Sequence, residues 1–179
     1  MKTKNLVLLF LFSFSLVFAY NNESTTDPIE KEAKTIVGVA ASNKNFSTLV
    51  AAVKSAKLVD VLTEKGPFTV FAPTNDAFAK LPEGTIPTLL KPENKKLLTS
   101  ILTYHVVTGK FDAKAVGAIK ANGGKFVIKT VQGNELTAMI KDGNVLLKDA
   151  KGNVSKVIIT DVSVSNGIIH AIDSVIMPE

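Results

Sequence analysis

The spacing of apolar residues divides the chain into two halves of different character. Between residues 36 and 105, apolar positions mostly recur three or four apart, which is typical of amphipathic helices. Beyond residue 120 they stand in short runs rich in Val and Ile, which is typical of strands. The pattern predicts helices at residues 36–40, 46–62, 92–105 and 112–119, and strands at residues 68–71, 126–128, 136–140, 145–147, 157–159 and 168–177.

The residues between these elements indicate how each one begins or ends. Asp142 and Gly143 form a two-residue hairpin turn, so the later strands are expected to pair antiparallel. Asn45 is a suitable N-cap for the helix at 46–62, and Thr74 or Asn75 for a helical turn after Pro73. Pro87 and Pro92 predict a loop. The order of elements therefore predicts an α+β fold, with helices mainly in the N-terminal half packed on a twisted antiparallel sheet formed mainly by the C-terminal half.

The first 32 residues differ from the rest of the chain. Residues 1–19 combine two lysines, an uncharged apolar run and a terminal alanine, which predicts a signal peptide. Its apolar run is shorter than the roughly 20 residues that span a membrane. Residues 20–32 are polar and predict a flexible tether, which leaves residues 33–179 as one domain. We therefore expect a secreted protein that is extracellular, attached to the cell surface or periplasmic, with no stable membrane span after cleavage.

Composition narrows the possible functions. The chain has no cysteine, hence no disulfide framework, and its 21 basic residues are all lysine. Without arginine or tryptophan it lacks the side chains that most often recognise nucleic acids. Two histidines and scattered carboxylates make no metal cluster, and no catalytic or cofactor-binding motif is present. We therefore expect no cofactor, no metal and no enzyme activity.

Two long strings and one residue pair are more specific. The string TVFAPTNDAF at residues 69–78 and the string GIIHAIDSVIMP at residues 167–178 resemble the two signature boxes of fasciclin domains. Tyr104 and His105 resemble the tyrosine-histidine pair that this family carries between the boxes. The resemblance extends from about residue 33 to residue 178.

The resemblance implies a wedge of β-strands flanked by helices in an extracellular adhesion protein. In some animal members, the tyrosine-histidine pair and an Asp-Ile dipeptide before the second box bind integrins. The matching residues here are Tyr104, His105, Asp161 and Val162, so the dipeptide is Asp-Val. The residues of the boxes with an implied structural role are Thr74, Asp76, His170 and Asp173.

Several interpretations stay open on the sequence alone. Tyr104 and His105 either join a helix to a strand in the core or border a recognition surface. In the second box, apolar residues occupy both faces of the strand, so His170 is expected in the interior with Asp76, Thr74 or a backbone carbonyl as its hydrogen-bond partner. We also expect the stretch around Phe71 to lie against the terminal strand.

One concentration of lysines has two interpretations. It is either a solvated face or a surface that attracts an acidic polysaccharide or an anionic cell envelope, and it comprises Lys95, Lys96, Lys110, Lys114, Lys120, Lys125 and Lys129.

The leading functional hypothesis is an adhesion module that is a monomer or weak oligomer. It would bind a cell-surface or matrix protein or a polysaccharide through weak contacts. The alternative is a carrier of a small apolar ligand.

Overall fold

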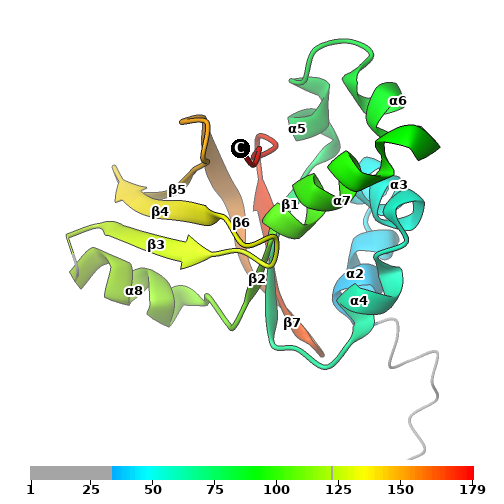
Figure 1. Cartoon of the computed structure of the whole chain (residues 1–179). Coiled ribbons are helices and arrows are strands. Elements are labelled where there is room, and N and C mark those ends of the chain that lie inside the picture. Colours follow the sequence, from blue (N-terminus) through cyan, green and yellow to red (C-terminus); the bar gives the residue numbers. More distant parts are fainter. Residues whose placement is uncertain (1–33, 122) are drawn as a thin grey trace, which may run out of the picture.

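The computed structural model describes residues 34–121 and 123–179, so the expected signal peptide and tether lie outside the described residues. Most helices gather at one end of the molecule and strands β3–β5 with α8 at the other (Figure 1). The helices are α2 (Ile36–Ser42), η1 (Lys44–Phe46), α3 (Ser47–Ala56), α4 (Val59–Thr63), α5 (Asn75–Ala79), α6 (Thr85–Leu89), η2 (Pro92–Asn94), α7 (Lys95–Tyr104) and α8 (Ala113–Ala121). The strands are β1 (Phe68–Pro73), β2 (Val106–Thr108), β3 (Lys125–Lys129), β4 (Glu135–Lys141), β5 (Asn144–Lys148), β6 (Val154–Val164) and β7 (Gly167–Ile172).

The strands form one seven-stranded sheet in the order β2-β1-β7-β6-β5-β4-β3. Strands β3 to β7 pair antiparallel in chain order, which confirms the predicted α+β fold. Strand β1 lies parallel to β7, a pairing that the antiparallel prediction did not contain. Within that pair Val70 is opposite Ile169 and Phe71 is opposite His170, as expected for the two boxes.

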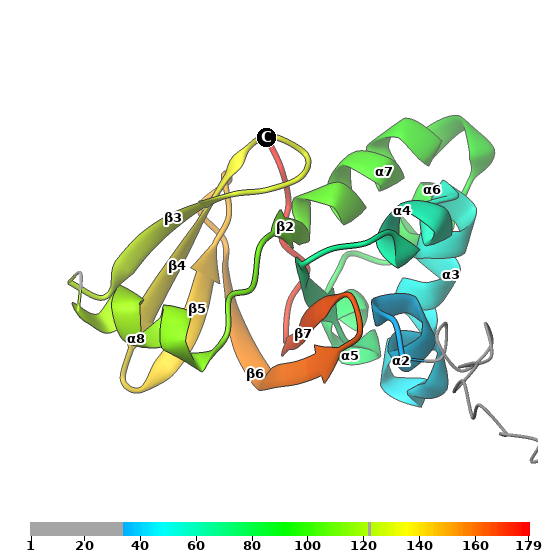
Figure 2. The same ribbon diagram turned by 90° about the horizontal axis from the view of Figure 1, so that it is seen from below.

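Apolar side chains fill two regions on opposite sides of β1 and β7. The larger core lies between those strands and the N-terminal helices, where Leu49, Leu98, Val70 and Ile169 pack together. The smaller core includes Phe71, Tyr104, Leu136, Leu147 and Ile172. Helix α8 lies across one face of β3 and β4, away from the other helices (Figure 2). Within the described residues no helix is long and apolar enough to cross a membrane.

The last strand is shorter than the sequence predicts. Every residue of β7 is buried, as the apolar residues on both its faces indicate, but the strand ends at Ile172 and does not continue to residue 177. Beyond Ile172 one main-chain hydrogen bond remains, from Asp173 N–H to the Lys156 carbonyl at 3.0 Å, and side chains become the partners of the backbone that follows. The Asp173 carboxylate accepts from Lys156 N–H at 2.8 Å, and Ser174 N–H donates to the Ser155 hydroxyl at 3.2 Å.

The predicted cap at Asn45 and the continuous helix at 46–62 are wrong. Helix α3 begins at Ser47, and Lys57, in the left-handed region with φ 59°, separates it from α4. The Asn75 side-chain oxygen, 27 residues away in sequence, accepts from Thr48 N–H at 3.1 Å. The Asn75 amide also donates to the Lys44 carbonyl at 2.9 Å. A residue of the first box therefore caps α3.

The proline-marked segment is also more ordered than predicted. Residues Thr85–Leu89 form α6, with Pro87 in its first turn. Proline is tolerated there because the first N–H groups of a helix have no partner within it. The predicted helix at 112–119 corresponds to α8, and the Asp112 carboxylate accepts from Lys114 N–H at 3.0 Å and Ala115 N–H at 3.2 Å.

Candidate functional site

His105 lies at the end of α7 and is almost completely buried, at 2% exposure. Its Nδ1 is 2.8 Å from the Ile101 carbonyl oxygen, and its Nε2 accepts from Ile176 N–H at 3.2 Å. Because a carbonyl can only accept, Nδ1 carries the proton and the ring is neutral. Burial lowers the pKa of His105 to about 4, although the Ile101 carbonyl and Asp149 oppose that shift.

His170 has a similar arrangement in β7. Its Nε2 donates to the Phe111 carbonyl at 2.6 Å, its Nδ1 accepts from Asp161 N–H at 3.1 Å, and its ring stacks on Phe71 with centroids 5.7 Å apart. Burial lowers the pKa of His170 against the opposing effects of the Phe111 carbonyl and nearby carboxylates. Of the partners considered from the sequence, the backbone carbonyl is the one found, and neither Asp76 nor Thr74 takes that place.

Tyr104 is fully buried, and its hydroxyl joins two segments of the sheet. It donates to the Glu135 carbonyl at 2.7 Å and accepts from Ala150 N–H at 3.1 Å. Burial raises the pKa of Tyr104, despite the hydrogen bond from Ala150. Tyr104 and His105 therefore have the interior contacts of a junction between helix and strand. A role in partner binding stays a prediction for both.

Asp161 and Val162 lie where β6 departs from regular pairing. The register against β7 shifts between Val157 and Ile159 and again between Ile159 and Val162. Within this irregularity Asp161 takes a left-handed conformation with φ 60°, and its side chain is exposed. Val162 is half-buried opposite Ile169.

Strands β1 and β7 connect the two candidate pairs. The His105 carbonyl accepts from Phe71 N–H at 2.9 Å, Phe71 is opposite His170, and His170 holds the Asp161 N–H. This path crosses about three strand spacings, roughly 14 Å. The fold therefore places a buried pair and an exposed irregularity of β6 in one row across the sheet.

The signature residues of the first box cap helices. The Thr74 hydroxyl accepts from Ala77 N–H at 3.2 Å, as predicted, and Asp76 is exposed in the first turn of α5. Sequence reasoning missed that Asn75 caps α3. Asparagine was recognised as a capping residue, but nothing in the sequence indicates which helix it reaches.

Asp173 of the second box ties β6 to the segment after β7. Its carboxylate accepts from Lys156 N–H at 2.8 Å and from the Lys80 ammonium at 3.1 Å. Burial opposes the ionisation of Asp173, but the hydrogen bonds from Lys156, Lys80 and Ser174 outweigh it and lower its pKa.

The contacts of these groups limit their chemistry. Both nitrogens of each histidine ring are occupied by backbone groups, so neither ring has a free nitrogen to accept a substrate proton or bind a metal. In residues 34–121 and 123–179, no group of three or more His, Asp or Glu side chains is placed to hold a metal ion. The geometry is that of structural hydrogen bonding.

An apolar cavity lies under α8, next to His170. Its walls include Phe71, Phe111, Val116, Ile128 and Leu147. Its free volume of about 20 Å³ is room for about one water molecule.

The lysines do not stay together as the sequence suggests. Lys95 and Lys96 belong to α7, Lys114 and Lys120 to α8, and Lys125 and Lys129 to β3. Strand alternation instead places lysines of four strands on the sheet face opposite α8, where Lys125 and Lys129 of β3 join Lys141, Lys148 and Lys156. The alternation of residues 135–148 was the signal that could have revealed this face.

Comparison with known proteins identifies the family. The family model described as "Fasciclin domain" matches residues 44–178. Protein sll1483 of Synechocystis sp. is 56% identical over 146 residues, which are 82% of this chain and 74% of that protein. The immunogenic protein MPB70 of Mycobacterium bovis is 40% identical over 168 residues, 90% of this chain and 78% of that protein.

Comparison with longer proteins and with a solved structure points to the same family. Transforming growth factor-beta-induced protein ig-h3 of Sus scrofa is 36% identical over 144 residues, 80% of this chain but 19% of that protein. A solved FAS1 domain pair from the insect cell adhesion molecule fasciclin I superposes with a TM-score of 0.71 at 20% identity, over 80% of this chain and 51% of that one. The chain therefore belongs to the fasciclin domain family.

Proposed function

We propose that the chain is a secreted adhesion module that binds a cell-surface or matrix protein or polysaccharide through weak contacts and without catalysis. The observation that carries this proposal is the exposure of β6. Val154, Ile158 and Ile159 are 50%, 48% and 46% exposed, and Asp161 follows them on the same strand. Apolar side chains that are not covered by their own domain are available to a partner. The fold shared with an insect cell adhesion molecule supports the same conclusion.

Within this proposal, Asp161 and Val162 form the accessible part of the candidate site, and Tyr104 and His105 hold the sheet from inside. The His170 ring fixes the Asp161 backbone, so the carboxylate is presented from a defined position in the irregular part of β6. Export by the leader at residues 1–19 would place the module outside the cytoplasm.

The test is retention of cells of the source organism on a surface coated with the mature protein. Retention above that on a surface coated with an unrelated domain is expected, and equal retention would contradict the proposed function. Asp161→Asn tests the charge of the Asp161 carboxylate, because asparagine tolerates the positive φ of this position and carries no charge. Asp142→Asn is the matched control, since Asp142 is also exposed with φ 51°.

We expect Asp161→Asn to weaken retention and Asp142→Asn not to weaken it. Equal retention by both variants would show that the Asp161 carboxylate does not take part in the contact. The adhesion function would then be decided by the retention that the wild-type protein gives.

The carrier alternative has less support. Pockets for small molecules enclose about 300–1,000 Å³, whereas the apolar cavity under α8 holds about 20 Å³ and the apolar cavity between the N-terminal helices and β1 holds about 30 Å³. Two larger hollows, of about 380 and 410 Å³, are lined mainly by polar and charged residues and do not suit an apolar ligand. Stoichiometric, saturable uptake of a lipophilic dye by the folded protein would favour the carrier.

A further inference from the structure

The sheet face opposite α8 carries an ordered arrangement of lysines. In the register of the sheet, Lys125 of β3 is opposite Met139 of β4, Met139 is opposite Leu146 of β5, and Leu146 is opposite Lys156 of β6. Paired residues of adjacent strands point to the same face. One row across the sheet therefore has two apolar side chains at its centre and a lysine at each end.

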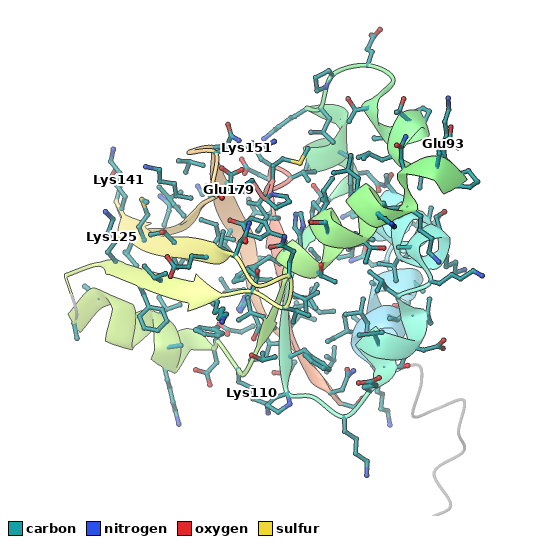
Figure 3. The ribbon with its side chains drawn as sticks, viewed as in Figure 1. Glu93, Lys110, Lys125, Lys141, Lys151 and Glu179 are labelled. Carbon is teal, nitrogen blue, oxygen red and sulfur yellow. The ribbon has the colours of Figure 1, made fainter. Side chains whose placement is uncertain are left out.

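Two more lysines complete the arrangement along the strands. Lys141 is two residues after Met139, and Lys148 is two residues after Leu146, so both lie on the same face as the row. We call Lys125, Lys141, Lys148 and Lys156 the lysine frame. Its four members surround Met139 and Leu146, and all four are exposed. Figure 3 shows Lys125 and Lys141 projecting from the same end of the sheet.

The positive charge of the lysine frame is not cancelled by its own domain. In the part of the chain that the structure describes, none of the four lysines forms an ion pair with a carboxylate. Lys129 differs, since it is directly opposite Glu135. The acidic groups at the border are Asp142, beside Lys141 in the hairpin turn, and Asp173, whose carboxylate accepts from the Lys156 N–H. Glu135, Asp149 and Glu179 line the same hollow as Lys148.

The spacing of the lysine frame indicates an extended anion. Lys125 and Lys156 are three strand spacings apart, roughly 14 Å, and Lys141 and Lys148 are separated by a similar distance. A single carboxylate or phosphate cannot contact lysines on opposite sides of the frame. A polymer with repeated negative charges can, and Met139 and Leu146, both half-buried, give it an apolar platform.

The residue types favour a polysaccharide over other polyanions. The face has no arginine to form bidentate phosphate contacts and no aromatic side chain on which bases could stack. It also lacks the tryptophan and tyrosine that anchor proteins at a lipid interface. We propose that the lysine frame binds an acidic polysaccharide. This proposal rests on the proposed adhesion function and adds to Asp161 and Val162 a second binding surface with a partner chemistry of its own.

The test measures binding of the mature protein to immobilised polygalacturonate, with neutral dextran as the uncharged control. We expect binding to polygalacturonate alone, weakened about tenfold or more when salt rises from about 50 to about 500 mM. Replacing the lysine frame in K125Q/K141Q/K148Q/K156Q should weaken binding about 20-fold or more, since each lysine adds a separate attraction to an anionic surface.

The matched control replaces exposed lysines of the helical end in K44Q/K54Q/K91Q/K96Q and so removes the same net charge. We expect less than about a threefold change, because these lysines belong to the helical end of the molecule and not to the face that carries the frame (Figure 1), and salt screens attraction at long range. An equal loss of binding in both variants would overturn the proposal, since it would show that net charge and not the arrangement of the lysine frame causes the attraction. Circular dichroism and thermal unfolding show whether both variants are folded.

Two further arms distinguish the partners. Frame-dependent binding to phosphatidylglycerol vesicles that equals or exceeds binding to polygalacturonate would overturn the polysaccharide assignment in favour of a membrane. Retention of cells without binding to polygalacturonate would overturn this inference and leave the proposed function standing. Frame-dependent binding to polygalacturonate without retention of cells would support the inference and contradict the adhesion function.

Discussion

Acidification is predicted to destabilise the protein before its carboxylates become protonated. The folded state holds His105 neutral with a pKa of about 4, whereas the unfolded chain has the ordinary value of 6.5. Below pH 6.5 the unfolded state therefore binds a proton that the folded state excludes, and stability falls as pH falls. The loss begins near pH 6.5 and is complete only about one pH unit below the folded-state pKa of about 4.

The magnitude follows from the two pKa values. At pH 5, the difference in proton binding at His105 lowers the free energy of unfolding by about 2 kcal/mol, and at pH 4 by about 3 kcal/mol. His170 contributes in the same direction, because burial lowers its pKa as well. The lowered pKa of Asp173 keeps that carboxylate ionised at pH 5, so its contribution is lost only at still lower pH.

The assay is urea unfolding followed by circular dichroism at pH 7.5 and pH 5, since the chain has no tryptophan for fluorescence. His105→Gln should lower stability at pH 7.5 and remove about 2 kcal/mol of the difference between the two pH values. The chain has only two histidines, so their titrations can be resolved by NMR, with His170→Gln giving the assignment. A measured His105 pKa above about 6 would refute the reasoning.

Four further predictions concern the hydrogen bonds, close contacts and open positions of the fold, each measured as the free energy of unfolding in urea. Tyr104→Phe should cost about 1–2 kcal/mol, because it leaves a carbonyl and an N–H in the sheet without their partner. Gly167→Ala should cost at least about 2 kcal/mol, since its Cβ would clash with the Phe68 carbonyl oxygen. By contrast, Gly117→Ala, with open space around it in α8, should be neutral or stabilising by up to about 1 kcal/mol. Thr74→Ala should cost about 1 kcal/mol through loss of the α5 cap. A free energy of unfolding that is unchanged by Tyr104→Phe, Gly167→Ala or Thr74→Ala would contradict the contact that the substitution removes or disturbs.

Local patterns predicted most elements because each depends on residues close together in sequence. Periodicity located α7 and α8, short apolar runs located β4 and β5, and Thr74 was recognised as a cap. The burial of β7 on both faces also followed from its residues alone. These features are set by side-chain spacing, which the sequence contains directly.

Features that depend on distant backbone groups could not be predicted. The carbonyls of Ile101 and Phe111 accept hydrogen bonds from the two histidines. Every residue has a backbone carbonyl, so the side chains of Ile101 and Phe111 do not indicate that their carbonyls have this role. The cap that Asn75 gives α3 also depends on a distant approach of the chain. The lysine run was misleading for a related reason, because neighbours in sequence face different directions once helix and strand are fixed.

Stability and binding are separated by the alternation of the sheet. On β4 and β5, the side chains that face α8 enter the apolar core, as Leu136 and Leu147 do, while the alternate residues face outward. Exposed substitutions away from caps and cores usually change stability by less than about 0.5 kcal/mol. Replacing Lys141 or Lys148 should therefore alter binding with little effect on unfolding, whereas replacing His105 should do the reverse at neutral pH. The outer face can consequently vary in charge while the histidine contacts that hold the fold stay the same.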